Sequence, residues 1–158
     1  MINIASFMAE NYCAWADRRL PTEAEWEKAA TWDEETQTKV LFPWGPDMDC
    51  SLANFRDSDF GECVGDTMPV GSYKNSANAY GIYDMVGNVW EFVTDWYDEN
   101  YYANSPYENP KGPDSGTIKG IRGGSFINGV DIVSPTHRGQ TIPGLAPFSA
   151  GIRCVLSD

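Results

Sequence analysis

Turn-forming sequences interrupt the chain at short intervals after residue 30, and this feature restricts the possible folds more than any other. The runs FPWG, NSANAYG and IRGGS are examples, and the chain holds 15 glycines and 10 prolines. Glycine admits positive φ, whereas proline fixes φ and lacks an N–H, so both residues end regular structure. This composition argues against a helical bundle, and short strands between ordered loops are expected.

Two helices are expected before the turn-rich part begins. Residues 5–17 place Phe, Met, Tyr and Trp at helical spacing. Thr22 and Glu25 have the spacing of a capping box ahead of a second helix, in which Trp26 and Ala30 share the buried face. Short strands are expected at Met68–Tyr73, Val89–Trp96, Gly116–Arg122 and Gly151–Leu156. This order of elements predicts one α+β domain with an unusually large share of loop.

The charge balance limits the partners that the chain can bind. It carries 11 basic and 23 acidic residues, for a formal net charge of −12. Phosphate groups are bound by clustered lysine and arginine, so nucleic acid and anionic membrane surfaces are poor partners. No apolar run approaches roughly 18 residues, and the N-terminus lacks the basic start of a signal peptide. We expect no nucleic-acid partner and no membrane insertion, in a chain that is cytoplasmic or displayed at a surface as part of a longer protein.

A series of motifs follows in a fixed order: RLPTEAEWEKAA, FPWG, LANF, PVGSY, NAYGIYDMVGNVWEFVTDWY, NPKGPDSG, RGGSF and GIRCV. Together they resemble the formylglycine-generating enzyme superfamily, also called the sulfatase-modifying-factor domain, from about Asn3 to Val155. The resemblance implies a C-type-lectin-like α+β fold with two helices, a small twisted antiparallel sheet and long ordered loops. Family members usually carry strands and a G-x-F-x-M-G motif before the first helix, and this chain is expected to lack them.

The resemblance implies a calcium site at the motif YDMVGNVWE. Matched residue by residue, its ligands are the side chains of Asp84 and Glu91 and the carbonyl oxygens of Gly87 and Val89. Calcium takes six to eight oxygen ligands of this kind. The alternative is that Asp84 caps a turn and Glu91 pairs with an arginine.

A second family calcium site is similar to the segment that begins at LANF. The corresponding residues are Asn54, Phe55, Glu62 and Val64, although the family has aspartate where Glu62 is aligned. Zinc is not expected, because one histidine and scattered cysteines offer no tetrahedral ligand set.

The four cysteines form no C-x-x-C pair, which excludes zinc-ribbon and thioredoxin-like sites. Cys13 and Cys154 match a family pair that can form a disulfide, and two buried thiols in contact are the alternative. Cys50 and Cys63 flank an acidic loop and could also pair.

The catalytic residues of the enzymatic relatives are missing. The formylglycine-generating oxidases bind copper(I) through two cysteines shortly after GGS, and soft thiolates suit that ion. This chain has none there; Asn128 stands near the first position. The related sulfoxide synthases hold iron through histidines, whereas His137 is the single histidine of this chain. Neither copper nor iron is expected, and Ser125 of GGS is expected to bond a turn amide.

One branch of the superfamily, the variable proteins of diversity-generating retroelements, uses this fold for ligand binding. Its segment after RGGS is mutagenised at adenines of Asn-type codons, which cannot yield Lys, Glu, Gln, Met or Trp. Those five types fill 27 of residues 1–125 but a single position of residues 127–156, Gln140. The resemblance implies a loop surface at about residues 127–149 that binds a protein partner.

The side chains expected to form this surface are apolar or small and polar, and they lie on loops of a scaffold pinned by calcium. They are Ile127, Asn128, Val130, Asp131, Ile132, Val133, His137, Gln140, Ile142, Leu145 and Phe148. For residues 127–133 a role in the hydrophobic core remains the alternative, while Phe126, Ile152 and Val155 are expected in the core.

Three functions remain open at this point. The first is a non-catalytic, calcium-stabilised module that binds a ligand or protein through residues 127–149. The second is a regulatory or scaffold domain of a larger multi-domain or multi-subunit system. The third is an oxidase-like enzyme, against which the missing cysteines and histidines argue.

Overall fold

The computed structural model describes residues 1–57 and 61–156. The chain divides into two compact units. Unit 1 comprises Met1–Trp26, Glu91–Arg122 and Arg138–Asp158, and unit 2 comprises Glu27–Trp90 and Gly123–His137. In the part of the chain that the structure describes, no helix is long and apolar enough to cross a membrane.

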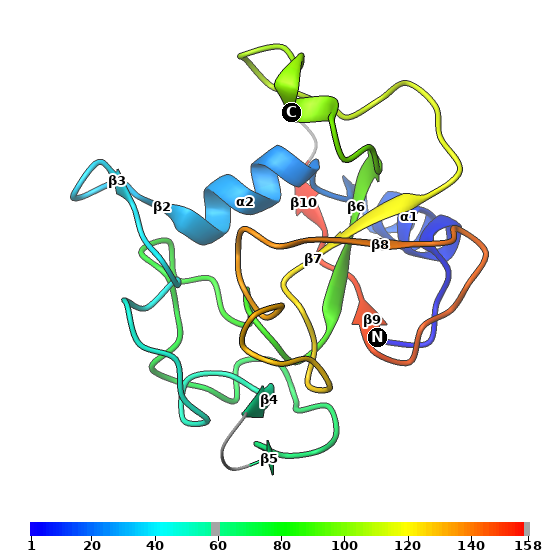
Figure 1. Cartoon of the computed structure of the whole chain (residues 1–158). Helices are drawn as coiled ribbons and strands as arrows, with labels where there is room; N and C mark the ends of the chain where they lie inside the picture. The colour runs from blue at the N-terminus through cyan, green and yellow to red at the C-terminus, as the bar shows by residue number, and fades with distance from the viewer. Residues whose placement is uncertain (58–60, 157–158) are drawn as a thin grey trace. The chain divides into compact units, whose positions relative to one another are not determined.

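A four-stranded antiparallel sheet organises unit 1. Its order is β8 (Arg138–Thr141), β7 (Lys119–Arg122), β6 (Trp90–Trp96) and β9 (Ala150–Gly151). In Figure 1 these strands are orange, yellow, green and red, respectively. Phe92 and Val93 of β6 are fully buried and form its core with Ile121 of β7. A two-stranded sheet joins β1 (Arg18–Arg19) to β10 (Val155–Leu156), and a short 3-10 helix spans Tyr101–Ala103.

The second helix, α2 (Glu23–Thr31), begins as its sequence predicts. The Thr22 hydroxyl accepts the Glu25 N–H at 3.2 Å, and the Glu25 carboxylate accepts the Thr22 N–H at 2.8 Å. These two bonds satisfy N–H groups that have no partner within the helix. Trp26 and Ala30 are each 1% exposed. The capping box and the buried face are both confirmed.

The first helix, α1 (Ser6–Trp15), lies within the predicted range but buries its smaller side chains. Ser6, Ala9 and Cys13 face inward, while the exposed residues are Phe7, Met8, Tyr12 and Trp15. The disulfide between Cys13 and Cys154 and an ion pair of 2.9 Å between Glu10 and Lys119 help to hold the helix in this orientation. Helical spacing alone therefore predicted the helix but could not predict which face is covered.

Unit 2 consists mainly of loops that side chains fasten to backbone. Its strands form two short hairpins, β2 (Trp32–Asp33) with β3 (Thr38–Lys39) and β4 (Arg56–Asp57) with β5 (Gly61–Glu62). The Asn88 side chain both donates to and accepts from the backbone of Met68, at 3.0 and 2.8 Å. A disulfide joins Cys50 to Cys63, as considered from the sequence. Amide side chains and a covalent bond here replace the ladders of a regular sheet.

Three of the predicted strands differ from the structure. Met68–Tyr73 is no strand, because Ser72 N–H bonds to Pro69 O and Gly71 adopts φ +70° in a turn. The strand predicted from Gly116 begins only at Lys119, and the last one is interrupted between β9 and β10. Phe126 is buried as expected, whereas Ile152 and Val155 are only half-buried.

Candidate functional site

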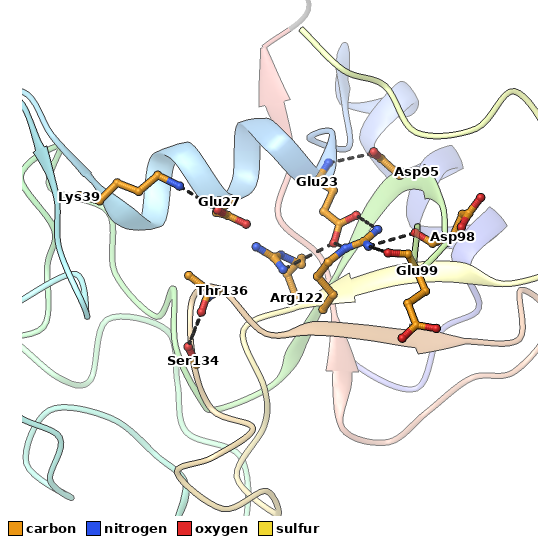
Figure 2. Close-up of polar contacts among 10 residues, drawn as sticks. Glu23, Glu27, Lys39, Asp95, Asp98, Glu99, Arg122, Ser134 and Thr136 are labelled. Atoms are coloured by element: carbon orange, nitrogen blue, oxygen red, sulfur yellow. Dashed lines mark hydrogen bonds and ion pairs between the residues drawn. The ribbon is translucent and has the colours of Figure 1, made fainter. Parts of the chain in front are cut away.

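A buried group of charged side chains surrounds the start of α2 in unit 1 (Figure 2). Both carboxylate oxygens of Glu23 accept from Arg138, through Nε and Nη2 at 2.8 Å each. Nη1 of Arg122 lies 3.5 Å from the same carboxylate, and Arg122 is 0% exposed. The Glu23 N–H in turn donates to Asp95 Oδ2 at 2.8 Å. Apart from the capping motif, no local sequence pattern predicts this cluster.

Burial raises the pKa of Asp95, and the charge of Glu23 raises it further against the hydrogen bond from the Glu23 backbone. Among the described residues, Asp95 Oδ1 finds no hydrogen-bond partner. A Cβ atom at Gly112 would lie 2.9 Å from this oxygen, so only glycine fits over it. Glu23, Asp95 and Arg122 are therefore closed off from solvent, which favours a structural role over a catalytic one.

The first predicted calcium set contains carboxylates that already have partners. In unit 1, Glu91 accepts from Arg153 Nε and Nη2 at 2.8 and 2.7 Å and from Trp26 Nε1 at 2.7 Å. In unit 2, Asp84 accepts the N–H of Gly71 at 2.6 Å. This is the alternative stated above, a capped turn and an arginine pair. A Glu91 carboxylate with both oxygens bound to a guanidinium does not fit Ca²⁺ as it stands, so calcium at this set stays a prediction.

The remaining members of that set lie in a tight loop of unit 2. Gly87 adopts φ +76°, and a Cβ there would lie 2.5 Å from the carbonyl oxygen of Asn54. Val89 is half-buried one residue before β6. Gly87 is thus required for the close approach of two backbone segments, whether or not its carbonyl binds a metal.

The second predicted calcium set has an oxygen without a partner. Asn54 is 0% exposed; its Nδ2 donates to Asp66 O at 2.7 Å, and its Oδ1 accepts nothing from the described residues. Glu62 is exposed on β5, and a Cβ at Gly65 would lie 2.8 Å from its Oε2, so this carboxylate folds back over the loop. A buried amide oxygen without a partner is the kind of ligand that a hard cation takes.

The other two members of this set, Phe55 and Val64, have apolar side chains, so only their backbone carbonyls could bind a cation. The Phe55 carbonyl accepts the N–H of Cys63 at 3.0 Å, and Val64 is 48% exposed. No group of three or more His, Cys, Asp or Glu side chains able to hold a metal occurs in residues 1–57 and 61–156. A cation at Asn54 would therefore depend on carbonyl and amide oxygens.

The unit 2 part of the predicted binding surface is a loop with both exposed and buried side chains. Ile127 and Val130 are 39% and 45% exposed, and Asp131 is exposed as well, while Asn128 and Ile132 are half-buried. Val133 is 0% exposed, and its Cα would lie 2.9 Å from a Cβ at Gly124. The assignment of Val133 to the surface is wrong: the Gly124 turn closes over it and makes it core.

Hydrogen bonds fix the shape of this loop. Asn128 Oδ1 accepts from the Ser125 N–H at 3.1 Å and hydroxyl at 2.7 Å, and Asn128 O accepts from Arg56 N at 2.9 Å. Beside the loop is a cavity of about 240 Å³. It is lined by Arg56, Asp57, Gly61, Gly129, Val130 and Asp131. The half-buried His137 ends this part, with its ring 5.9 Å from that of Trp90.

The unit 1 part of the surface begins at Gln140 in β8 and continues into the segment after that strand. Gln140 is exposed, and Ile142, Leu145 and Phe148 are 59%, 53% and 55% exposed. The N–H and hydroxyl of Ser6 both donate to Pro143 O, at 3.2 and 3.1 Å, and tie this segment to the start of α1. We call residues 127–133 and 140–148 the display loops. They present apolar side chains to solvent from a backbone held in place.

All four cysteines of the chain lie in disulfides, Cys13 with Cys154 and Cys50 with Cys63. Copper(I) is bound by thiolate, so the chain offers no thiolate ligand for it while these bonds are formed. The Ser125 hydroxyl is occupied by Asn128, in line with its expected role in a turn. The residues present do not fit a copper centre of the oxidase kind.

The family model for the sulfatase-modifying factor enzyme 1-like domain matches residues 1–158, which is the whole chain. The chain belongs to this family. The fold agrees: Treponema denticola variable protein 1, a solved structure, matches with a TM-score of 0.70 at 30% identity over 85% of this chain and 46% of that one. The loop-rich α+β architecture expected for a member of the family is confirmed.

Members of the family with other names are also similar to this chain. Serine/threonine-protein kinase pkn1 of Chlamydia caviae is 38% identical over 156 residues, which are 98% of this chain and 23% of that protein. A formylglycine-generating enzyme of Streptomyces coelicolor is 36% identical over 158 residues, 92% of this chain and 49% of that protein. The chain thus spans a quarter to half of the length of these relatives.

Proposed function

We propose that this family member is a non-catalytic binding module that contacts a protein partner through its display loops. The observation that carries the proposal is the set of half-exposed apolar side chains on loops fixed by Asn128 and Ser6. Apolar side chains on a rigid loop lose little entropy when they bind, which favours affinity. The lack of a free thiol at any cysteine position supports binding rather than oxidase chemistry.

The likeness to Treponema denticola variable protein 1 supports the same proposal. In this account the exposed positions of the display loops can change without loss of the fold, as diversification by a retroelement would require. The near absence of Lys, Glu, Gln, Met and Trp after residue 126 agrees with that history. Val133 and Gly124 are excluded from such variation because they form the core of the loop.

A partner-capture experiment tests the display loops directly. One variant carries Ile142→Ser, Leu145→Ser and Phe148→Ser, a second carries Ile127→Ser and Val130→Ser. A control carries Leu41→Ser and Val70→Ser, which are 62% and 88% exposed outside the loops. We expect the wild type and the control to capture the same partner and each loop variant to lose it, with unchanged circular dichroism.

Two outcomes would overturn this proposal. Capture by both loop variants at the wild-type level would show that the display loops are not the contact surface. Loss of the partner only on Phe7→Ser and Trp15→Ser, at the exposed face of α1, would move the surface there. Turnover of a cysteine-containing peptide with copper(I) and O₂ would restore the oxidase alternative.

We propose in addition that a calcium ion stabilises unit 2 at Asn54. The buried, unbonded Oδ1 of Asn54 supports this site over the one at Glu91, whose carboxylate is already bound to Arg153. Free calcium at 100 times its dissociation constant adds about 2.7 kcal/mol to the folded state, which corresponds to roughly 5–10 °C in the unfolding midpoint. We expect this rise when CaCl₂ replaces EDTA.

The quantity to compare is the difference between the unfolding midpoints in CaCl₂ and in EDTA. A substitution that only damages the fold lowers both midpoints, whereas one that removes the calcium site removes the difference. Asn54→Ala is expected to abolish the difference, whereas Asn75→Ala, at an exposed asparagine of the same unit, keeps it. Equal differences in the two variants, or none in the wild type, would contradict the proposal.

A second function, a regulatory domain of a longer protein, is favoured by one observation. The Chlamydia caviae relative named as a kinase contains the matched region as 23% of its length. In that arrangement the display loops would bind another segment of the same polypeptide. Binding of such a segment, prepared as an isolated peptide, by the wild-type chain but not by the loop variants would distinguish this function from recognition of a separate protein.

A further inference from the structure

Unit 2 contains a cavity that the proposed function does not use. Its volume is about 330 Å³, at the lower end of the range for small-ligand pockets. It is lined by Ala30, Trp32, Asp33, Val40, Pro43, Trp44, Gly45, Ala77, Asn78 and Ala79. Two tryptophans and one carboxylate among small side chains make its composition distinct from that of an ordinary surface hollow.

The Trp44 side chain is held in place, and the backbone of Trp32 is held in a paired strand. The Trp44 indole stacks on Phe42, with ring centroids 5.8 Å apart and planes at 9°, and its Nε1 donates to Asp47 O at 2.8 Å. Trp32 lies in β2, opposite Lys39 in the hairpin. Aromatic side chains that are already fixed lose little conformational entropy when a ligand binds between them.

The opposite side of the cavity is equally fixed. Asn78 is 8% exposed; its Nδ2 donates to Ala29 O at 2.5 Å, and its Oδ1 accepts the N–H groups of Tyr80 and Ile82 at 3.0 and 2.9 Å. These bonds fasten the loop that contains Ala77 and Ala79 to the end of α2. The cavity is therefore formed without a ligand.

The electrostatics of the cavity favour positive charge. Asp33 Oδ1 accepts the N–H groups of Glu35 and Thr36, while Oδ2 accepts no bond from any described residue. The nearest cation along the hairpin, Lys39, is paired with Glu27 at 3.2 Å. Unit 2 contains four basic and 12 acidic residues, a difference of −8.

Tyr80, next to the lining residue Ala79, interacts with two of the carboxylates of this unit. Burial raises the pKa of the Tyr80 hydroxyl, and its hydrogen bond to Glu34 and the charges of Glu34 and Asp33 raise it as well. An anionic ligand would meet these carboxylates, whereas a cation would be attracted to them and to the indole faces.

We propose that this cavity binds an organic cation, with an alkylammonium or guanidinium head between Trp32 and Trp44 and next to Asp33. Aromatic faces attract such heads through their quadrupole, and weakly hydrated methylated ammonium groups are the best suited because they are easily desolvated. The head can belong to a free small molecule or to a lysine or arginine side chain of a peptide. The site lies in unit 2 and does not depend on the display loops.

Binding is measured by calorimetry and tryptophan fluorescence with matched probes. Choline is compared with 3,3-dimethylbutan-1-ol, which has the same shape without the charge, and we expect about tenfold tighter binding of choline. N-acetyl-lysine amide and N-acetyl-arginine amide form the second arm. Tighter binding of these two than of choline assigns the site to peptide side chains, and the reverse assigns it to free methylated ammonium compounds.

Variants locate the binding within the cavity. Asp33→Asn and Trp44→Leu are each expected to weaken choline binding about tenfold, because one removes the carboxylate charge and the other an indole face. Glu35→Gln is the matched control, since it removes one charge from the same turn at a residue that does not line the cavity. Asp33→Asn keeps the turn, because asparagine accepts the same N–H bonds.

Three results would contradict the proposal: equal binding of choline and its neutral isostere, no binding of any cationic probe, or the same loss in Glu35→Gln as in Asp33→Asn. Failure of this site would leave the display-loop proposal untouched.

Discussion

Replacing Cys13 and Cys154 together with alanine is expected to lower the free energy of unfolding by about 5 kcal/mol. The disulfide joins residues separated by 141 positions, so it restricts almost the whole unfolded chain. It also holds α1 against the strand pair β1–β10, since Cys13 lies on the inward face of the helix. The double substitution leaves no free thiol that could form a wrong pair. Urea unfolding monitored by circular dichroism measures the loss.

The disulfide between Cys50 and Cys63 is the matched control for that experiment. Its partners are separated by 13 positions, and the same loop-entropy argument gives about 3 kcal/mol for its removal. The test therefore compares the two double substitutions by how much each lowers the free energy of unfolding. A larger loss for the Cys50 and Cys63 pair would contradict the assignment of the long-range disulfide as the main covalent support of the fold.

Glu23→Gln is expected to destabilise the protein by about 3–5 kcal/mol, although the side chain keeps its size. Glu23 is 1% exposed, and both of its carboxylate oxygens accept hydrogen bonds from Arg138. The same carboxylate lies 3.5 Å from the guanidinium group of the fully buried Arg122. Without the carboxylate two guanidinium groups remain with less negative charge between them. The unfolding midpoint should fall by roughly 10 °C or more.

Glu25→Gln provides the comparison in the same helical turn. Glu25 binds Arg19 through both oxygens but is exposed, so the loss is expected to stay below about 1 kcal/mol. Glutamine also preserves the capping box with Thr22. Similar effects of the two substitutions would show that burial of the Glu23 cluster contributes little to stability.

Local patterns in the sequence predicted the elements that depend on neighbouring residues. The capping box of Thr22 and Glu25 and the buried pair Trp26 and Ala30 appear as expected, because both arise within one or two helical turns. The exposed aromatic face of α1 was not predictable in this way. A disulfide to residue 154 decides its orientation, and no local pattern contains that contact.

The candidate sites show the same division between local and long-range determinants. The motif around Glu91 matches a family calcium site, yet Arg153, 62 positions away, occupies its carboxylate. Val133 lies in a loop that also carries exposed apolar side chains, and the Gly124 turn packs against it and buries it. The cavity proposed to bind an organic cation is lined by both the hairpin at Trp32 and the loop at Asn78, which are far apart in the sequence.

The dissociation constant of the captured partner for the wild type, the loop variants and the control variant tests the central proposal most directly. If the display loops form the contact surface, each loop variant weakens binding at least about tenfold, while Leu41→Ser with Val70→Ser leaves the constant within about twofold. Equal constants for all four proteins, each folded by circular dichroism, would contradict the account and place the binding surface elsewhere.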